Sequence, residues 1–138
     1  MSQDERTEHN NSPHASTVGL PASLDAPALA RLHLRQFRPQ LAPPILDDAL
    51  ILTSELVTNA VFHGKPKISL SVHIEMPNLI VAVSDESPMM PPEIPELPLL
   101  AAPHGRGLAI VDSVAAEWGV RRHIPGPGKV VWFLLPLR

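Results

Sequence analysis

Three polar residues recur at every fourth position in an otherwise apolar segment. Glu55, Asn59 and His63 have this spacing, and residues four apart lie on one face of an α-helix. An asparagine amide oxygen can ligate a hard cation, and a carboxylate can orient or deprotonate an attacking oxygen. The stripe suits a magnesium–nucleotide site, although this segment alone favours the simpler interpretation of a solvated helix face.

A carboxylate closes a segment of alternating aliphatic residues. Asp85 follows Leu79, Val81 and Val83 at a spacing of two, and such residues share one face of a β-strand. The carboxylate is therefore expected among core side chains, where it needs a hydrogen-bond donor. An adenine amino group would serve, and so would a backbone N–H of the next loop.

Two glycines surround an arginine just before an apolar helical pattern, in the segment Gly105, Arg106, Gly107 and Leu108. At a loop-to-helix junction, glycine permits close backbone approach, and the first N–H groups and the positive end of the helix dipole attract phosphate. Many helices begin after glycine, so an ordinary helix start is the alternative.

These residues depend on elements that the hydrophobic pattern predicts. A helix capped by Ser23 or Asp25 should run through Phe37 and stop before Pro39, and a second should span Pro44–Phe62, with Gly64 as its C-terminal cap. The period then changes from 3.6 to 2, which predicts strands over 67–75, 79–85, 118–124 and 129–137. Six prolines between residues 86 and 103 predict a long loop, and a third helix follows Leu108.

The order of elements predicts an α+β fold, a two-layer sandwich in which helices cover one face of a mixed, mostly antiparallel sheet. A short edge strand is expected near Val18–Leu20, and residues 1–17, which carry no large apolar side chain after Met1, are expected to be a disordered tail. Residues 18–138 then form one domain. Trp118 and Trp132 are expected in its core.

Composition excludes several functions. The chain has 138 residues, 11 basic and 14 acidic side chains, a net charge of −3 and no cysteine. It therefore has no disulfide framework, thiolate zinc site or cysteine nucleophile. The absence of a basic cluster argues against nucleic-acid binding, and no apolar run approaches the ~20 residues of a membrane helix. We expect a cytoplasmic protein.

Taken in order, the three features resemble the N, G1 and G2 boxes of the GHKL ATP-binding superfamily, which has the Bergerat fold. The likeness is strongest to the anti-sigma factor and serine kinase branch of the RsbW type. It rests on the string Ser54–His63, on Gly105–Leu108 followed by Trp118 and Gly119, and on a last strand beginning Lys129–Phe133. It covers about residues 18–138.

The resemblance implies ATP and Mg²⁺ as cofactors and assigns a role to each residue. Asn59 would coordinate the metal, Glu55 would be the general base, and Asp85 would accept a hydrogen bond from the adenine amino group. His63 would lie near the nucleotide, and Gly105, Arg106, Gly107 and Leu108 would line the lid and phosphate side. It also implies phosphorylation of a serine or threonine on a small anti-sigma-antagonist-type partner, binding of a sigma factor, and a homodimer.

The G1 box departs from the family pattern. It usually reads Asp-x-Gly-x-Gly, whereas this chain has Asp85-Glu86-Ser87-Pro88-Met89, without either glycine. The alternative expectation is therefore a non-catalytic protein-binding module with weak or lost nucleotide binding. The intact Glu55 and Asn59 favour the kinase. A histidine kinase fragment is a weaker match, because no segment of this sequence predicts a phosphoacceptor helix hairpin.

Overall fold

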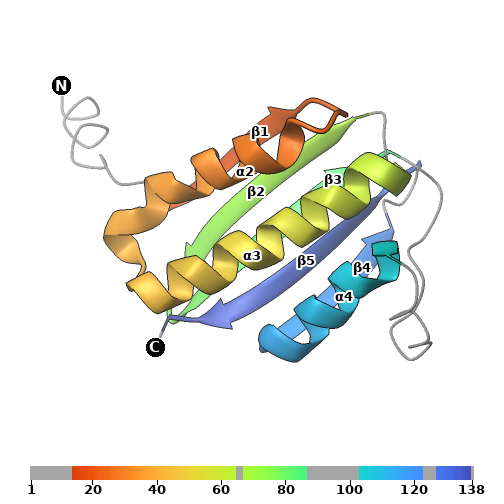
Figure 1. The fold of residues 1–138 in the computed structure, drawn as a ribbon. Coiled ribbons are helices and arrows are strands. Elements are labelled where there is room, and N and C mark those ends of the chain that lie inside the picture. Colours follow the sequence, from red (N-terminus) through yellow and green to blue (C-terminus); the bar gives the residue numbers. More distant parts are fainter. Residues whose placement is uncertain (1–13, 65–66, 87–102, 123–126, 138) are drawn as a thin grey trace, which may run out of the picture.

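Helices lie against one face of an antiparallel sheet (Figure 1). This computed structural model describes residues 14–64, 67–86, 103–122 and 127–137. Their elements are β1 (Ala15–Leu20), α2 (Ala26–Leu34), the 3-10 helix η1 (Arg35–Gln40), α3 (Pro43–Asn59), the π-helical turn η2 (Ala60–Gly64), β2 (Ile68–Glu75), β3 (Asn78–Asp85), α4 (Pro103–Val114), β4 (Glu117–Arg122) and β5 (Lys129–Pro136). The predicted α+β class is confirmed. All described strand pairs are antiparallel, in the order β1-β2-β3-β5-β4.

The period-2 pattern of the strands creates the core. In β3 and β5 every second side chain is buried on the helix-covered face, and the residues between them are half-buried. Helix α3 faces this layer with a stripe of buried residues at helical spacing: Leu46, Ala49, Leu52, Thr53, Leu56 and Val57. Burial of these apolar surfaces is the main favourable contribution to folding.

Helix α2 ends earlier than predicted. Its buried residues are Ala26, Ala30 and Leu34, whereas Leu32 remains 64% exposed. The α-helix ends at Leu34, and η1 carries the chain on past Pro39. Asp25 occupies the N-cap position without a side-chain capping bond.

The edge strand begins earlier than expected. Strand β1 starts at Ala15 rather than near Val18, so Ala15–Thr17, assigned to the tail, pair with β2. The hydroxyls of Thr17 and Ser71 also hydrogen-bond at 2.9 Å. Residues 1–13 and 87–102, which hold most of the predicted tail and most of the proline-rich loop, lie outside the described residues. Within the described part, no helix is long and apolar enough to cross a membrane.

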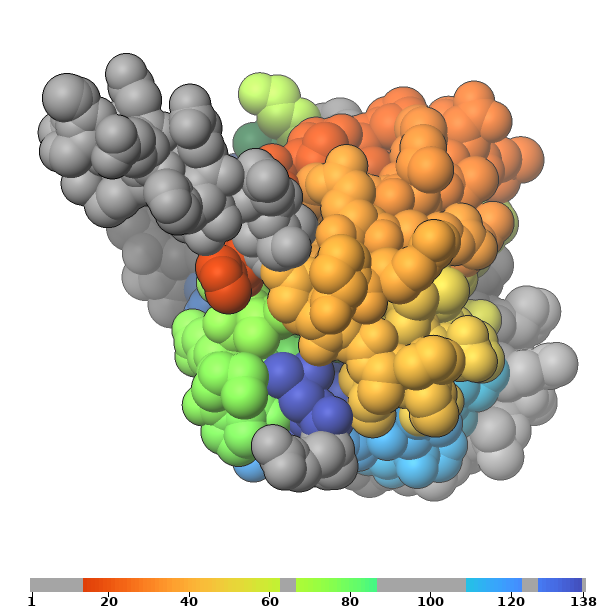
Figure 2. All heavy atoms as spheres, turned by 90° about the vertical axis from the view of Figure 1, so that its left-hand side faces the viewer, coloured from red at the N-terminus to blue at the C-terminus, as the bar shows by residue number. Residues whose placement is uncertain are grey.

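One end of the molecule is closed by the β2–β3 hairpin. The backbone N–H of Leu137, just after β5, donates to the carbonyl of Pro77 at 2.8 Å. Figure 2 looks onto this end, where the green hairpin and the dark-blue C-terminal residues lie beside the orange start of α3. The candidate site residues at the other end of α3 are far from this closure.

Trp132 is not in the helix-covered core, contrary to expectation. It lies on the opposite face of the sheet, where its indole covers Gly119 of β4, the residue beside it in the strand register. A Cβ added at Gly119 would meet the ring at 3.0 Å. Trp118, on the covered side, packs against the core.

We expect Gly119→Ala to destabilise the fold by about 1 kcal/mol, because the methyl group would displace the Trp132 ring. Gly19→Ala is the matched control: it also lies in a strand, and its Cβ would meet nothing within 4 Å. The control should be neutral or stabilise by about 0.4–1 kcal/mol, since alanine restricts the unfolded chain. Urea denaturation measures both. Equal stabilities would contradict the close contact with Trp132.

His33 on α2 is a half-buried base that packs against an aromatic ring. Its Nε2 has no hydrogen-bond partner among the described residues, and its ring meets Phe37 edge-on at a centroid distance of 6.3 Å. Burial lowers the pKa of His33 below its ordinary value of 6.5. The folded protein therefore holds this histidine neutral at a pH where the unfolded chain would protonate it.

The protein should lose stability as the pH falls below about 6.5, because the unfolded state then binds the proton more readily than the folded state. Above this pH the contribution of His33 is fully present. Urea midpoints at pH 7.5 and 5.5 should differ less for His33→Leu than for the wild type. The same decrease in both proteins would show that other groups cause the pH dependence.

Candidate functional site

The last two turns of α3 carry the predicted carboxylate and amide. Glu55 and Asn59 are both half-buried, beside the buried Leu56 and Val57. The α-helix ends at Asn59, and the next five residues form the π-helical turn η2. His63 lies in this turn, so its backbone does not continue the predicted every-fourth-residue stripe; its side chain is outside the described part. π-Helical turns are frequent at functional sites.

Arg31 of α2 contacts this segment through a hydrogen bond that the sequence analysis does not predict. Its Nη1 donates to the Ser54 hydroxyl at 3.0 Å, and that hydroxyl donates to the carbonyl of Leu50 at 2.9 Å. The first bond connects α2 to α3 at the residue before Glu55, and the second lies within α3. The contact involves residues 23 positions apart, so no local pattern could indicate it.

Asp85 is buried, as predicted, and its carboxylate pairs with the ammonium of Lys129. This donor is neither the adenine amino group nor the backbone N–H that the sequence suggested. Only 2% of the residue is exposed, and the Lys129 Nζ lies 3.1 Å from its Oδ1 and 3.0 Å from its Oδ2. Lys129 is 4% exposed and stands opposite Asp85 in the β3–β5 register. Gly128, at a φ of 108°, takes the backbone through a turn that favours glycine immediately before Lys129.

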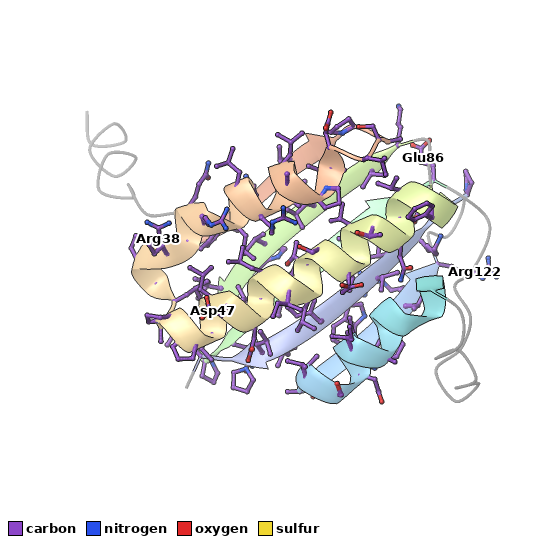
Figure 3. All side chains as sticks on the ribbon, viewed as in Figure 1. Arg38, Asp47, Glu86 and Arg122 are labelled. Atoms are coloured by element: carbon purple, nitrogen blue, oxygen red, sulfur yellow. The ribbon has the colours of Figure 1, made fainter. Side chains whose placement is uncertain are left out.

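The described site elements meet at one end of the sheet. Strand β3 ends at Asp85, β5 begins at Lys129 and β2 begins at Ile68, which is registered with Asp85. The turn η2 contacts β2 and β3 there. Figure 1 shows the C-terminal end of α3 and the first turn of α4 at this same end. Glu86 and Arg122 mark it in Figure 3, opposite Arg38 and Asp47.

Helix α4 begins before the glycine motif, not after it. The helix starts at Pro103, so Gly105, Arg106, Gly107 and Leu108 are already helical. The expected loop-to-helix junction therefore lies two residues earlier. Among these four residues, only the Gly105 N–H belongs to the first turn, where helical N–H groups lack intrahelical acceptors. The four side chains lie outside the described residues.

The donor set fits magnesium held largely by a nucleotide. The described residues contain no group of three or more histidine, aspartate or glutamate side chains that could hold a metal by themselves. Mg²⁺ commonly takes only one or two protein oxygens and completes its shell with phosphates and waters. The half-buried Asn59 amide can supply one such oxygen.

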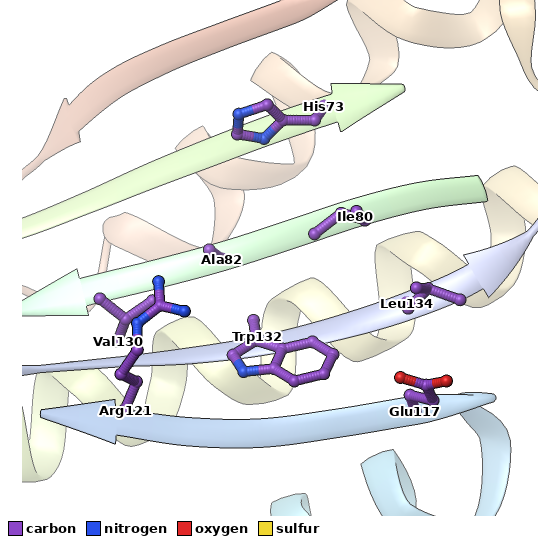
Figure 4. Close-up of a pocket in the computed structure, with 8 residues that line it drawn as sticks. All are labelled: His73, Ile80, Ala82, Glu117, Arg121, Val130, Trp132 and Leu134. Carbon is purple, nitrogen blue, oxygen red and sulfur yellow. The ribbon is translucent and has the colours of Figure 1, made fainter. Parts of the chain in front are cut away.

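A pocket of about 330 Å³ lies on the uncovered face of the sheet (Figure 4). Its centre is apolar, with Ile80, Trp132 and Leu134, and Glu117 and Arg121 of β4 add opposite charges. None of the predicted site residues lines it. The sheet therefore separates this pocket from the carboxylate and amide of α3.

A sequence model of the family described as "Histidine kinase-, DNA gyrase B-, and HSP90-like ATPase" matches residues 47–138. The matched region begins near the start of α3 and includes every predicted site residue. A search of curated proteins found no match.

Solved structures of histidine kinases resemble this chain. The histidine kinase AdeS of Acinetobacter baumannii is 15% identical, with a TM-score of 0.50 over 99% of this chain and 77% of that one. This likeness concerns the fold. The histidine kinase domain of a blue-light activated histidine kinase from Erythrobacter litoralis is 27% identical, with a TM-score of 0.49 over 65% of this chain. The match spans only 43% of the Erythrobacter chain.

Removing one member of the Asp85–Lys129 pair should destabilise the protein strongly. Lys129→Met leaves a buried carboxylate without its cation, which typically costs about 3–5 kcal/mol. The double variant Asp85→Leu/Lys129→Met should recover most of that loss, because an apolar pair carries no desolvation cost. Urea denaturation of the two variants measures the difference. A double variant as unstable as Lys129→Met would contradict the coupling.

Proposed function

The chain belongs to the histidine kinase-, DNA gyrase B- and HSP90-like ATPase family, and on this premise we propose that it is an ATP-binding regulatory protein that phosphorylates another protein. The observation that carries the proposal is the meeting of α3, the end of β3 and the start of α4 at one end of the sheet. The Asn59 amide, the Glu55 carboxylate, the buried Asp85 carboxylate and the first N–H groups of α4 are thus available within one region.

Each group has a separate task in this proposal. The Asn59 amide oxygen holds Mg²⁺ against the phosphates, and the Asp85 carboxylate accepts a hydrogen bond from the adenine amino group. The first N–H groups of α4 face the phosphates, because a helix N-terminus stabilises negative charge. Bound MgATP supplies the transferable phosphoryl group and the positive charge that offsets its phosphates. Catalysis of this kind rests mainly on positioning and electrostatics.

Glu55 is the proposed general base. Its carboxylate would accept the proton of the acceptor hydroxyl, a serine or threonine of the partner protein. The Arg31–Ser54–Leu50 bonds restrain the helix turn that carries Glu55, so the backbone that bears the base would stay in place in each cycle. A general base of this kind contributes about 10²–10⁴-fold to a rate.

The proposed partner is a small protein of the anti-sigma-antagonist type, with a sigma factor as a second partner. The support is the string Ser54–His63 together with Gly105–Leu108, Trp118 and Gly119, which resembles the RsbW-type branch. The alternative is a non-catalytic binding module of the same fold. Ser87 and Met89 at the glycine positions of the G1 box favour this alternative.

Asn59→Ala should abolish magnesium-dependent ATP binding, because it removes the proposed protein ligand of the metal. Calorimetric titration of ATP into the wild type with magnesium should give micromolar affinity, about −8 kcal/mol, and much weaker binding with EDTA. Asn78→Ala, at the start of β3 and the opposite end of the sheet, is the matched control and should bind as the wild type does. Wild-type affinity in Asn59→Ala would refute the metal assignment.

Glu55→Ala should retain ATP binding while its rate of ADP formation falls by about 100-fold or more. The binding titration and an ADP-release assay separate the two effects. Glu75→Ala, an exposed glutamate at the end of β2, is the control. If wild-type protein binds ATP but forms no ADP with any acceptor protein supplied, the non-catalytic alternative is supported.

A further inference from the structure

The Asp85–Lys129 pair is a buried ion pair at the end of the sheet where the nucleotide site is proposed. Both residues are almost fully buried, and the ammonium reaches both carboxylate oxygens. Taking two charges out of water is expensive, and an apolar pair of similar volume is often as stable or more stable. Stability alone therefore gives little reason for a lysine at this position.

Lysine leaves a donor available beside the carboxylate. An ammonium group has three N–H donors, and two suffice for Oδ1 and Oδ2 of Asp85. The third has no partner among the described residues. Each carboxylate oxygen can accept more than one hydrogen bond. The pair therefore holds, side by side, carboxylate oxygens that can accept a further hydrogen bond and an ammonium with a third donor.

This arrangement is complementary to one edge of adenine. The 6-amino group is a donor, and the neighbouring ring nitrogen N1 is an acceptor; proteins read unpaired bases through this edge. We propose that Lys129 is a base-specificity residue, whose ammonium donates to adenine N1 while Asp85 accepts from the 6-amino group. This inference rests on the proposed ATP-binding function and adds a residue to it.

The same arrangement rejects 6-oxo purines at two positions. In the adenine orientation, guanine would direct its carbonyl O6 at the Asp85 carboxylate and its N1–H at the Lys129 ammonium. Both contacts join like with like, an acceptor with an acceptor and a donor with a donor. Asp85 alone would provide only the first mismatch, so Lys129 strengthens the discrimination.

The first test changes the ligand and leaves the protein intact. Calorimetry compares wild-type binding of MgATP, Mg-1-deaza-ATP, which has a C–H in place of N1, and MgGTP. We expect 1-deaza-ATP to bind about tenfold or more weakly than ATP, since a hydrogen bond to a charged donor is lost. GTP should bind about 100-fold or more weakly, because two contacts are mismatched. Equal binding of ATP and 1-deaza-ATP would overturn the role of Lys129 and leave the proposed function standing.

The second test changes the protein. In Lys129→Met the difference between ATP and 1-deaza-ATP should vanish, whereas it should persist in Lys67→Met, which removes an exposed lysine just before β2. A difference that persists in a folded Lys129→Met would overturn the inference. ATP binding by Lys129→Met but not by the wild type would also overturn it, and would show that Lys129 blocks the base site. Absence of ATP binding in every protein would refute the nucleotide function itself.

Discussion

The packing of α3 against one face of the sheet is the interaction on which the rest of the arrangement depends. Leu52, Leu56 and Val57 of the helix are buried, as are the alternate aliphatic residues of β3 and β5. The apolar stripe of the helix is buried only against the apolar face of the sheet. The helix therefore lies on that face and not on the other. Its last turns then come to the end where β3 stops and β5 starts, and this brings Glu55 and Asn59 to the region of Asp85.

One-sided packing also explains the uncovered face. The half-buried residues of β3 and β5 point away from the helices, and Trp132 covers the backbone of Gly119 there. A strand glycine has no side chain to pack, so a neighbouring aromatic ring restores contact across the pair. The apolar pocket of this face is formed by side chains of the strands alone, and it is separate from the polar end of α3.

Two polar contacts lie near the C-terminal end of α3 and the end of β3, one hydrogen bond between helices and one buried ion pair. Arg31 and Ser54 connect α2 to the turn before Glu55, and Lys129 neutralises Asp85 in the interior. Buried polar groups of this kind are stable only when their partners are correctly placed. The Arg31–Ser54 bond therefore restrains the helix backbone, and the Asp85–Lys129 pair places hydrogen-bonding atoms at the end of the sheet.

The sequence by itself determined the helix of Glu55 and Asn59, the α+β class and the burial of Asp85. These follow from repeats of 3.6 and 2, which are properties of a single segment of backbone. Only the tertiary structure decided that Lys129, 44 residues away, meets Asp85, that Arg31 meets Ser54, and that Trp132 lies on the uncovered face. Such pairings depend on strand register and on helix placement. These arise from the packing of the whole chain, and a local period carries no information about which distant segment will be its neighbour.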